Sequence, residues 1–237
     1  MRYFILLLAL TSSALLHGQE KSKTRSCRIL FLERPANTPH TMHLFDGRES
    51  LKVDLPKMNL SKEYTLPAGP LRLSLVPESV SSPEGLPAGA PFVNLPESMT
   101  DFYLLLFSDP SNMVAPVRMQ VVDASMQRLR IGQTQWFNLT ELTIGGRFGE
   151  QKIVIKPMSL LVMDAPRADG GDYPVSMAYR TADIDTPYPI CETRWTHDPR
   201  ARNLGFIISK KGVRTPRVFL IPDFRAKKEP EQHATQP

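Results

Sequence analysis

Short apolar or alternating runs, separated by Pro, Gly, Asn and Asp, recur along the whole chain. Residues 71–76 alternate between apolar and polar positions, which is the period of a half-buried strand. Residues 102–107 are all apolar, as expected of a central strand with both faces covered. Because many such runs lie between closely spaced turn signals, the pattern predicts an all-β sandwich or barrel.

Landmarks of the first half recur in the second half at a nearly constant distance. The matched positions are Pro56 with Pro157, Pro67 with Pro166, Leu71 with Tyr173, and Tyr103 with Leu204. Their separations are 101, 99, 102 and 101 residues. A period of about 100 residues is the size of an immunoglobulin-like sandwich. We therefore predict two tandem immunoglobulin-like β-sandwich domains that arose by internal duplication.

This pattern places the first domain at residues 26–110 and the second at residues 111–224, with the linker and an opening strand within 111–126. Five of the chain's 22 prolines lie in residues 77–96, which predicts a long, irregular loop. Residues 225–237 are charged and polar and predict a disordered tail.

The first 18 residues have the layout of a secretory signal peptide. A short basic start precedes an apolar stretch from Phe4 to Leu16, and small residues follow it. We expect cleavage after Gly18, with Ala14 as the alternative site. The apolar run is shorter than the roughly 20 residues that span a bilayer, so we expect an exported protein without a transmembrane segment after cleavage.

Basic residues are concentrated in the second half. Residues 24–110 contain 8 Lys plus Arg against 10 Asp plus Glu, whereas residues 111–228 contain 18 against 11. An exported basic surface commonly meets an anionic polymer, and export argues against nucleic acid. The alternative is a solvated face that only aids solubility.

Two cysteines, Cys27 and Cys191, remain after signal cleavage. An oxidising compartment permits a disulfide between them, and the alternative is two separate buried thiols. His197 and Asp198 resemble two members of a catalytic triad, but the sequence offers no nucleophile elbow to complete it. No cluster of residues has the spacing of a metal or cofactor site. We therefore expect a protein without catalytic activity or cofactor.

A ligand surface is predicted around the aromatic and basic residues of the second domain. Tryptophan side chains on a sandwich either stack on sugar rings or belong to the core. The candidate surface comprises Trp136, Trp195, His197, Arg194, Arg200 and Arg202.

The second half also resembles a known group of proteins. The segments 132–140, 145–149 and 153–157 combine an aromatic-Asn strand, a Gly-rich turn, a short strand and a proline turn. This unit resembles uncharacterised exported bacterial β-sandwich proteins and, more loosely, periplasmic accessory proteins of alginate acetylation. The resemblance implies a Gram-negative periplasm and a non-enzymatic role. The tandem sandwich pattern and the basic second domain predict a binding or assembly module that contacts an anionic polysaccharide or envelope proteins. A carbohydrate-binding module or a sugar-modifying enzyme is the alternative.

Overall fold

The computed structural model describes residues 24–35, 38–181 and 184–225. The predicted signal peptide and residues 226–237 of the predicted tail lie outside these ranges. The described residues form strands and one 3-10 turn, η1 (Pro83–Gly85), and contain no α-helix. Accordingly, this part of the chain has no helix that could cross a bilayer.

The first domain consists of two four-stranded sheets that face each other. Sheet A has the order β4 (Tyr64–Pro67), β1 (Thr24–Phe31), β7 (Asp101–Ser108) and β8 (Val117–Asp123). Sheet B has the order β3 (Ser50–Asp54), β2 (Thr41–Phe45), β5 (Leu71–Val76) and β6 (Phe92–Leu95). All neighbouring strands are antiparallel except β1 and β7, which are parallel.

The second domain repeats this topology with every strand number advanced by eight. Sheet C has the order β12 (Ser159–Met163), β9 (Thr134–Asn138), β15 (Ala201–Lys210) and β16 (Val213–Phe224). Sheet D has the order β11 (Gln151–Ile155), β10 (Thr143–Phe148), β13 (Gly171–Thr181) and β14 (Ile184–His197). Its one parallel pair, β9 with β15, corresponds to β1 with β7. The prediction of two tandem β-sandwiches is confirmed, and the identical strand order supports a duplication.

The backbone after the third strand of each domain corrects one detail of the predicted match. Met58 and Met158 both have positive φ, at 55° and 48°, a conformation rare for side chains other than glycine. Aligning these two methionines places Pro56 opposite Lys156 rather than opposite Pro157. The two prolines therefore flank the same turn but differ by one position.

The predicted boundary between the domains is wrong. Strand β8 pairs antiparallel with β7 along its whole length, so it belongs to the first domain and not to the second. The first domain thus extends to Asp123, and the second begins at Thr134. The error arose because β8 has an ordinary alternating pattern, and such a pattern does not specify which sheet the strand joins.

The predicted irregular loop is also shorter than expected. Residues 92–95 of the proposed 77–96 segment form β6, an edge strand that pairs with β5. Pro91 and Pro96 flank this strand, which fits the confinement of proline to strand ends and edges. In the second domain only residues 182–183 separate the corresponding strands, β13 and β14.

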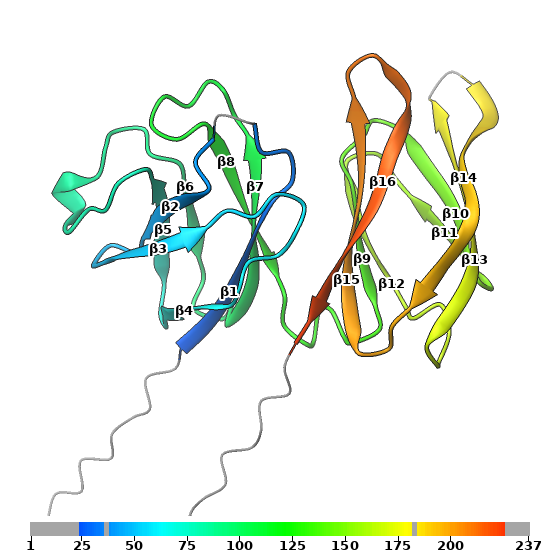
Figure 1. Ribbon diagram of the computed structural model, residues 1–237, viewed down its shortest axis with the longest axis horizontal. Coiled ribbons are helices and arrows are strands. Elements are labelled where there is room, and N and C mark those ends of the chain that lie inside the picture. Colours follow the sequence, from blue (N-terminus) through cyan, green and yellow to red (C-terminus); the bar gives the residue numbers. More distant parts are fainter. Residues whose placement is uncertain (1–23, 36–37, 182–183, 226–237) are drawn as a thin grey trace, which may run out of the picture.

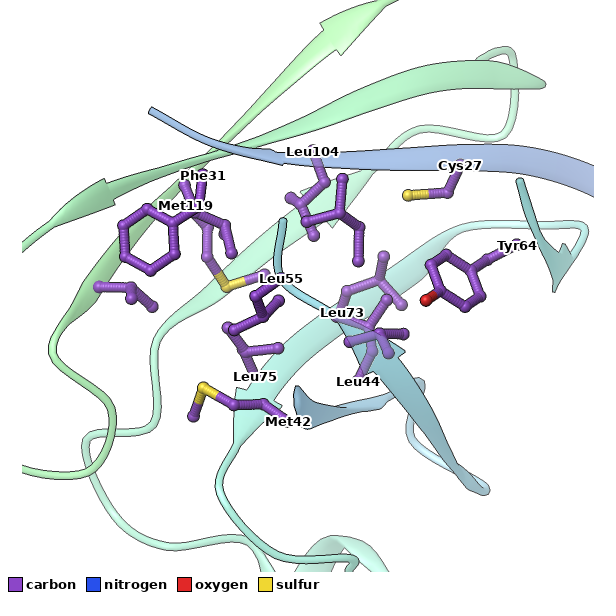
Figure 2. Packing of buried hydrophobic residues seen from close by; sticks show 14 of the residues in the cluster. Cys27, Phe31, Met42, Leu44, Leu55, Tyr64, Leu73, Leu75, Leu104 and Met119 are labelled. Atoms are coloured by element: carbon purple, nitrogen blue, oxygen red, sulfur yellow. The ribbon is translucent and has the colours of Figure 1, made fainter. Parts of the chain in front are cut away.

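Alternate residues of the central strands of sheet A serve two different cores. Phe102, Leu104 and Leu106 of β7 pack into the core between sheets A and B. Figure 2 shows this core, in which Leu104 and Cys27 lie across from Leu44 and Leu73. Tyr103 and Leu105 point the opposite way. The apolar run 102–107 therefore has both faces covered, as the sequence predicted.

The second face of sheet A packs against sheet C, so the two sandwiches form four stacked layers in the order B, A, C, D (Figure 1). The interdomain cluster contains apolar residues of both domains and of the connector: Leu30, Leu32, Tyr103, Leu105, Val122, Ala124, Leu129, Phe137, Leu204, Phe206 and Ile221. An interface this apolar holds the domains as one unit.

A buried ion network crosses the same interface, centred on Asp223 of β16. Its carboxylate accepts hydrogen bonds from Arg28 (2.7 Å) and Tyr103 (2.5 Å) of the first domain. It also accepts hydrogen bonds from Arg202 (2.9 Å) and Arg225 (2.7 Å) of the second. Because a buried carboxylate is costly unless it is fully paired, these four donors explain how Asp223 can be completely buried.

We predict that Asp223→Ala lowers the free energy of unfolding by about 3–5 kcal/mol, because the Arg202 guanidinium would stay buried without its main partner. Urea denaturation measures this loss. Asp198→Ala is the matched control, since Asp198 pairs with Arg200 at the surface, and it should change stability little. A loss for Asp223→Ala as small as that of the control would contradict the role of the network.

Acid should weaken the same interface. Burial alone raises the pKa of Asp223, but hydrogen bonds from Tyr103 and Arg225 outweigh it and hold this pKa below its usual range. The carboxylate therefore contributes stability above its unfolded pKa of about 3.9, and this contribution is lost as the pH falls through the lower folded pKa. Urea midpoints measured between pH 7 and pH 2 should fall less steeply for Asp223→Asn than for the wild type. Equal slopes would count against this account.

Candidate ligand-binding surface

The two tryptophans of the predicted ligand surface belong to the core of the second domain. Trp136 is fully buried between sheets C and D, and its ring centroid lies 5.4 Å from that of Phe148. Trp195 is partly buried and stacks on Trp136 at 6.2 Å. Of the two roles that the sequence left open for these tryptophans, the core role holds for both, and the buried Trp136 offers no sugar-stacking surface.

His197 and Asp198 do not act as a pair. His197 is buried, its Nε2 has no hydrogen-bond partner among the described residues, and burial lowers its pKa. Asp198 instead accepts two side-chain hydrogen bonds from Arg200, at 3.0 and 2.8 Å, and these lower its pKa to about 2. A general base needs an orienting carboxylate and a nucleophile within reach, and Asp198 is turned to Arg200 instead.

The three predicted arginines have different environments. Arg202 is fully buried, and its Nη1 donates to the carbonyl oxygens of Ala124 (2.6 Å) and Leu129 (3.0 Å). It therefore belongs to the interdomain ion network and not to a surface. Arg200 is exposed in the turn after β14, and Arg194 is exposed on the outer face of sheet D.

The disulfide that the sequence left open between Cys27 and Cys191 does not form. Cys27 is buried in the core of the first domain, and Cys191 is partly buried on β14 of the second. Both are free thiols that lie on opposite sides of the interdomain interface, and burial raises the pKa of each. The alternative of two separate thiols is the correct one.

A shallow hollow lies on the outer face of sheet D, the layer farthest from the first domain (Figure 1). Its volume is about 400 Å³. The lining residues come from all four strands of the sheet: Thr143, Gly145, Gly146, Arg147, Lys152, Ile153, Val154, Ser176, Ala178, Arg180 and Pro187. Arg147, Lys152 and Arg180 are basic, and no acidic residue is among the described lining residues, so Arg147 and Lys152 make the hollow suited to an anionic group.

Two adjacent glycines in β10 shape this hollow in different ways. A Cβ on Gly145 would have no atom within 4 Å, so its missing side chain leaves open space on the outer face. A Cβ on Gly146 would lie 2.5 Å from the buried ring of Phe148. The sequence pattern predicts a turn at this Gly-Gly pair, but both residues lie within β10. Small residues flank the hollow, because Gly145 pairs with Ala178 and Arg147 with Ser176.

Like charges face each other across the edge of this hollow. Arg147 and Lys152 are direct cross-strand partners on β10 and β11, and both are exposed. Like charges directly opposite each other destabilise a sheet. Neither forms an ion pair with another described residue. An anion bound between them would relieve this repulsion.

A larger hollow at the open end of the interdomain interface is less suited to a charged ligand. Its volume is about 530 Å³, and it is lined by both acidic and basic side chains. These charges neutralise one another, because Arg225 pairs with Glu63 (3.2 Å) and with Asp101 (3.1 Å). Arg202 pairs with Asp101 as well.

The corrected boundary also changes the charge distribution. Residues 134–225 contain 13 Lys plus Arg against 10 Asp plus Glu, so part of the excess belongs to the connector and the tail. The distinctive charged feature of sheet D is the pair of facing cations Arg147 and Lys152 on its β10–β11 side. No group of His, Cys, Asp and Glu in the described ranges has the geometry of a metal site.

The two glycines should respond differently to substitution. Gly146→Ala should lower the free energy of unfolding by about 1–3 kcal/mol, because its methyl group would collide with the packed Phe148 ring. Gly145→Ala, the matched control, should leave stability unchanged or slightly higher, since its methyl group would enter open space. Thermal or urea denaturation measures both. A larger loss of stability for Gly145→Ala than for Gly146→Ala would show that the outer face is not open at Gly145.

Comparison with known proteins adds no functional assignment. No protein-family model matches the sequence, and no curated protein matches it. The resemblance to exported β-sandwich proteins and to alginate-acetylation accessory proteins stays a prediction from the residues that carry it.

Proposed function

We propose that this chain is an exported, non-catalytic binding module that contacts an anionic polymer, such as an acidic polysaccharide, through the outer face of sheet D. The observation that carries this proposal is the basic hollow around Gly145. Arg147, Lys152 and Arg180 line it, and none of the described acidic residues does. The carboxylate or sulfate groups of an acidic polysaccharide would supply anions in repeating form.

Extended surfaces suit a polymer better than deep pockets do. The hollow lies on an exposed face of sheet D. Arg194 of β14, the cross-strand partner of Pro174, lies on the same face. A chain crossing sheet D could therefore contact several cations in turn. The carboxylates of Asp172 and Glu192 lie on this face as well, and Asp172 already accepts a hydrogen bond from Thr196 (2.7 Å). These two carboxylates limit the basic region of this face to the β10–β11 side.

A sugar-modifying enzyme and a carbohydrate-binding module remain the alternatives. The first would use His197 and Asp198, although Asp198 is paired with Arg200. The second would need an exposed aromatic platform for neutral sugars, but Trp136 is buried. A panel of cell-wall and polysaccharide substrates, tested with the wild type and with the His197→Ala/Asp198→Ala variant, distinguishes the enzyme from the module. Turnover that this variant loses would overturn the proposal.

Removing the two facing cations should weaken binding. We expect Arg147→Ala/Lys152→Ala to reduce affinity for alginate and for heparin by roughly tenfold or more, because two charge contacts are lost. Isothermal titration calorimetry at low and high salt measures this, and binding of the wild type should weaken as salt rises. Neutral dextran tests the carbohydrate-binding alternative.

Lys210→Ala/Lys211→Ala is the matched control, because it removes the same charge from the exposed β15–β16 turn. It should retain nearly full affinity. Equal losses in both variants would indicate attraction by net charge alone, and preferential binding to dextran would favour a neutral-sugar module. Either result would contradict a specific anion site on sheet D, as would the absence of any binding by the wild type.

A further inference from the structure

One of the sheet edges lacks the features that normally keep strands from pairing with other molecules. Natural proteins protect edge strands with charged residues, prolines, bulges or very short length. Strand β12 has the sequence Ser-Leu-Leu-Val-Met, with no charge and no proline, and it lies at the edge of sheet C.

The other edges are protected. Strand β4 ends in Pro67, and the four-residue β6 lies between Pro91 and Pro96. Charged residues occur on the remaining edge strands: Lys52 and Asp54 on β3, Arg118 and Asp123 on β8, Lys152 on β11, Glu192 and Arg194 on β14, and Arg214 and Arg217 on β16. Among the described strands, β12 is therefore the edge best able to accept another strand.

The exposed side chains of β12 are large and apolar. Leu160 is 53% exposed and Val162 is 43% exposed. Leu160 is the cross-strand partner of Phe137, which belongs to the interdomain cluster. Leu160 and Val162 therefore lie on the face of sheet C that packs against sheet A, at the margin that sheet A leaves uncovered.

Met158, which precedes β12, is exposed and lines a hollow of about 320 Å³ at the corner of the interface. Phe107 and Leu139 line this hollow too, and the charged residues Glu33 and Arg118 border it. The exposed part of β12 is thus continuous with the interface that holds the two domains together. A strand added beside β12 would extend that apolar layer.

We propose that β12 pairs antiparallel with β12 of a second copy of this chain, centred on Leu161, to form one continuous eight-stranded sheet from two copies of sheet C. In this register Leu160 of one copy lies opposite Val162 of the other. Side chains alternate between faces, so all four exposed residues fall on the same face of the joined sheet. The strand is therefore complementary to itself, as a two-fold interface requires.

A second copy fits this edge better than a charged partner does. The chain has a net charge of +5, but β12 itself has no charge, so two copies can approach here without direct repulsion at the axis. Pairing would satisfy the outward-facing backbone groups of both edges and would cover Leu160 and Val162. Because five residues form a small interface, we expect a dimer that dissociates in the micromolar range.

This inference does not depend on the proposed polymer binding, since β12 belongs to sheet C and the basic hollow to sheet D. The test is sedimentation equilibrium of the chain from residue 19 onward over a range of concentrations. We expect a reversible monomer–dimer equilibrium. Hydrogen exchange of the wild type should show that the outward amides of residues 159–163 become protected as the protein concentration rises.

Val162→Lys should raise the dimer dissociation constant by roughly tenfold or more, because it places a charge beside the two-fold axis, opposite Leu160 of the other copy. Val213→Lys is the matched control: Val213 is 48% exposed on β16, at the opposite edge of sheet C from β12, and the dimer should be unaffected. Circular dichroism and urea midpoints establish that both variants fold. A wild type that is monomeric throughout, a dimer unchanged by Val162→Lys, or protection confined to another strand would overturn the proposal.

Discussion

The buried carboxylate of Asp223 fixes how the two halves of the molecule fit together. Apolar residues of sheets A and C could slide past one another with little change in buried area. Asp223 adds a directional requirement, because Arg28 and Tyr103 must reach it from one domain while Arg202 and Arg225 reach it from the other. We infer that the network selects one arrangement of the domains, whereas the apolar cluster provides most of the stabilisation.

This constraint explains which predictions from the sequence succeeded. Covering both faces of β7 requires apolar residues at every position, and the run 102–107 was recognisable for that reason. The placement of β8 in the first domain could not be predicted in this way. An alternating pattern shows which face of a strand is buried, but it does not show which strand lies beside it. A strict use of the repeat would have corrected this, since β16 shifted back by 101 residues spans 112–123 and contains β8. The order of strands within each sheet depends on contacts between distant residues that no local pattern contains.

The candidate site was harder to predict than the fold. Arg202 and Arg194 are alike in sequence terms, yet one is buried against Asp223 and the other is exposed on sheet D. Trp136 and His197 were candidates because tryptophan and histidine often bind ligands, but both side chains are buried. The sequence pattern that indicates the hollow on sheet D is Thr143, Gly145 and Arg147, because alternate residues of a strand lie on the same face. Glycine's preference for turns made a strand harder to predict at these positions.

Stacking the domains through sheets A and C leaves only the outer faces of B and D fully accessible, and the two copies of the repeat have diverged there. Sheet D carries the hollow made by Gly145 and bordered by Arg147 and Lys152. The edges have diverged too, since β4 ends in proline whereas its counterpart β12 has neither proline nor charge. A duplicated fold can thus keep one copy for structural support while the other acquires surfaces for binding. The shared interface constrains sheets A and C of both copies, whereas both surfaces for which we propose a binding role belong to the second domain.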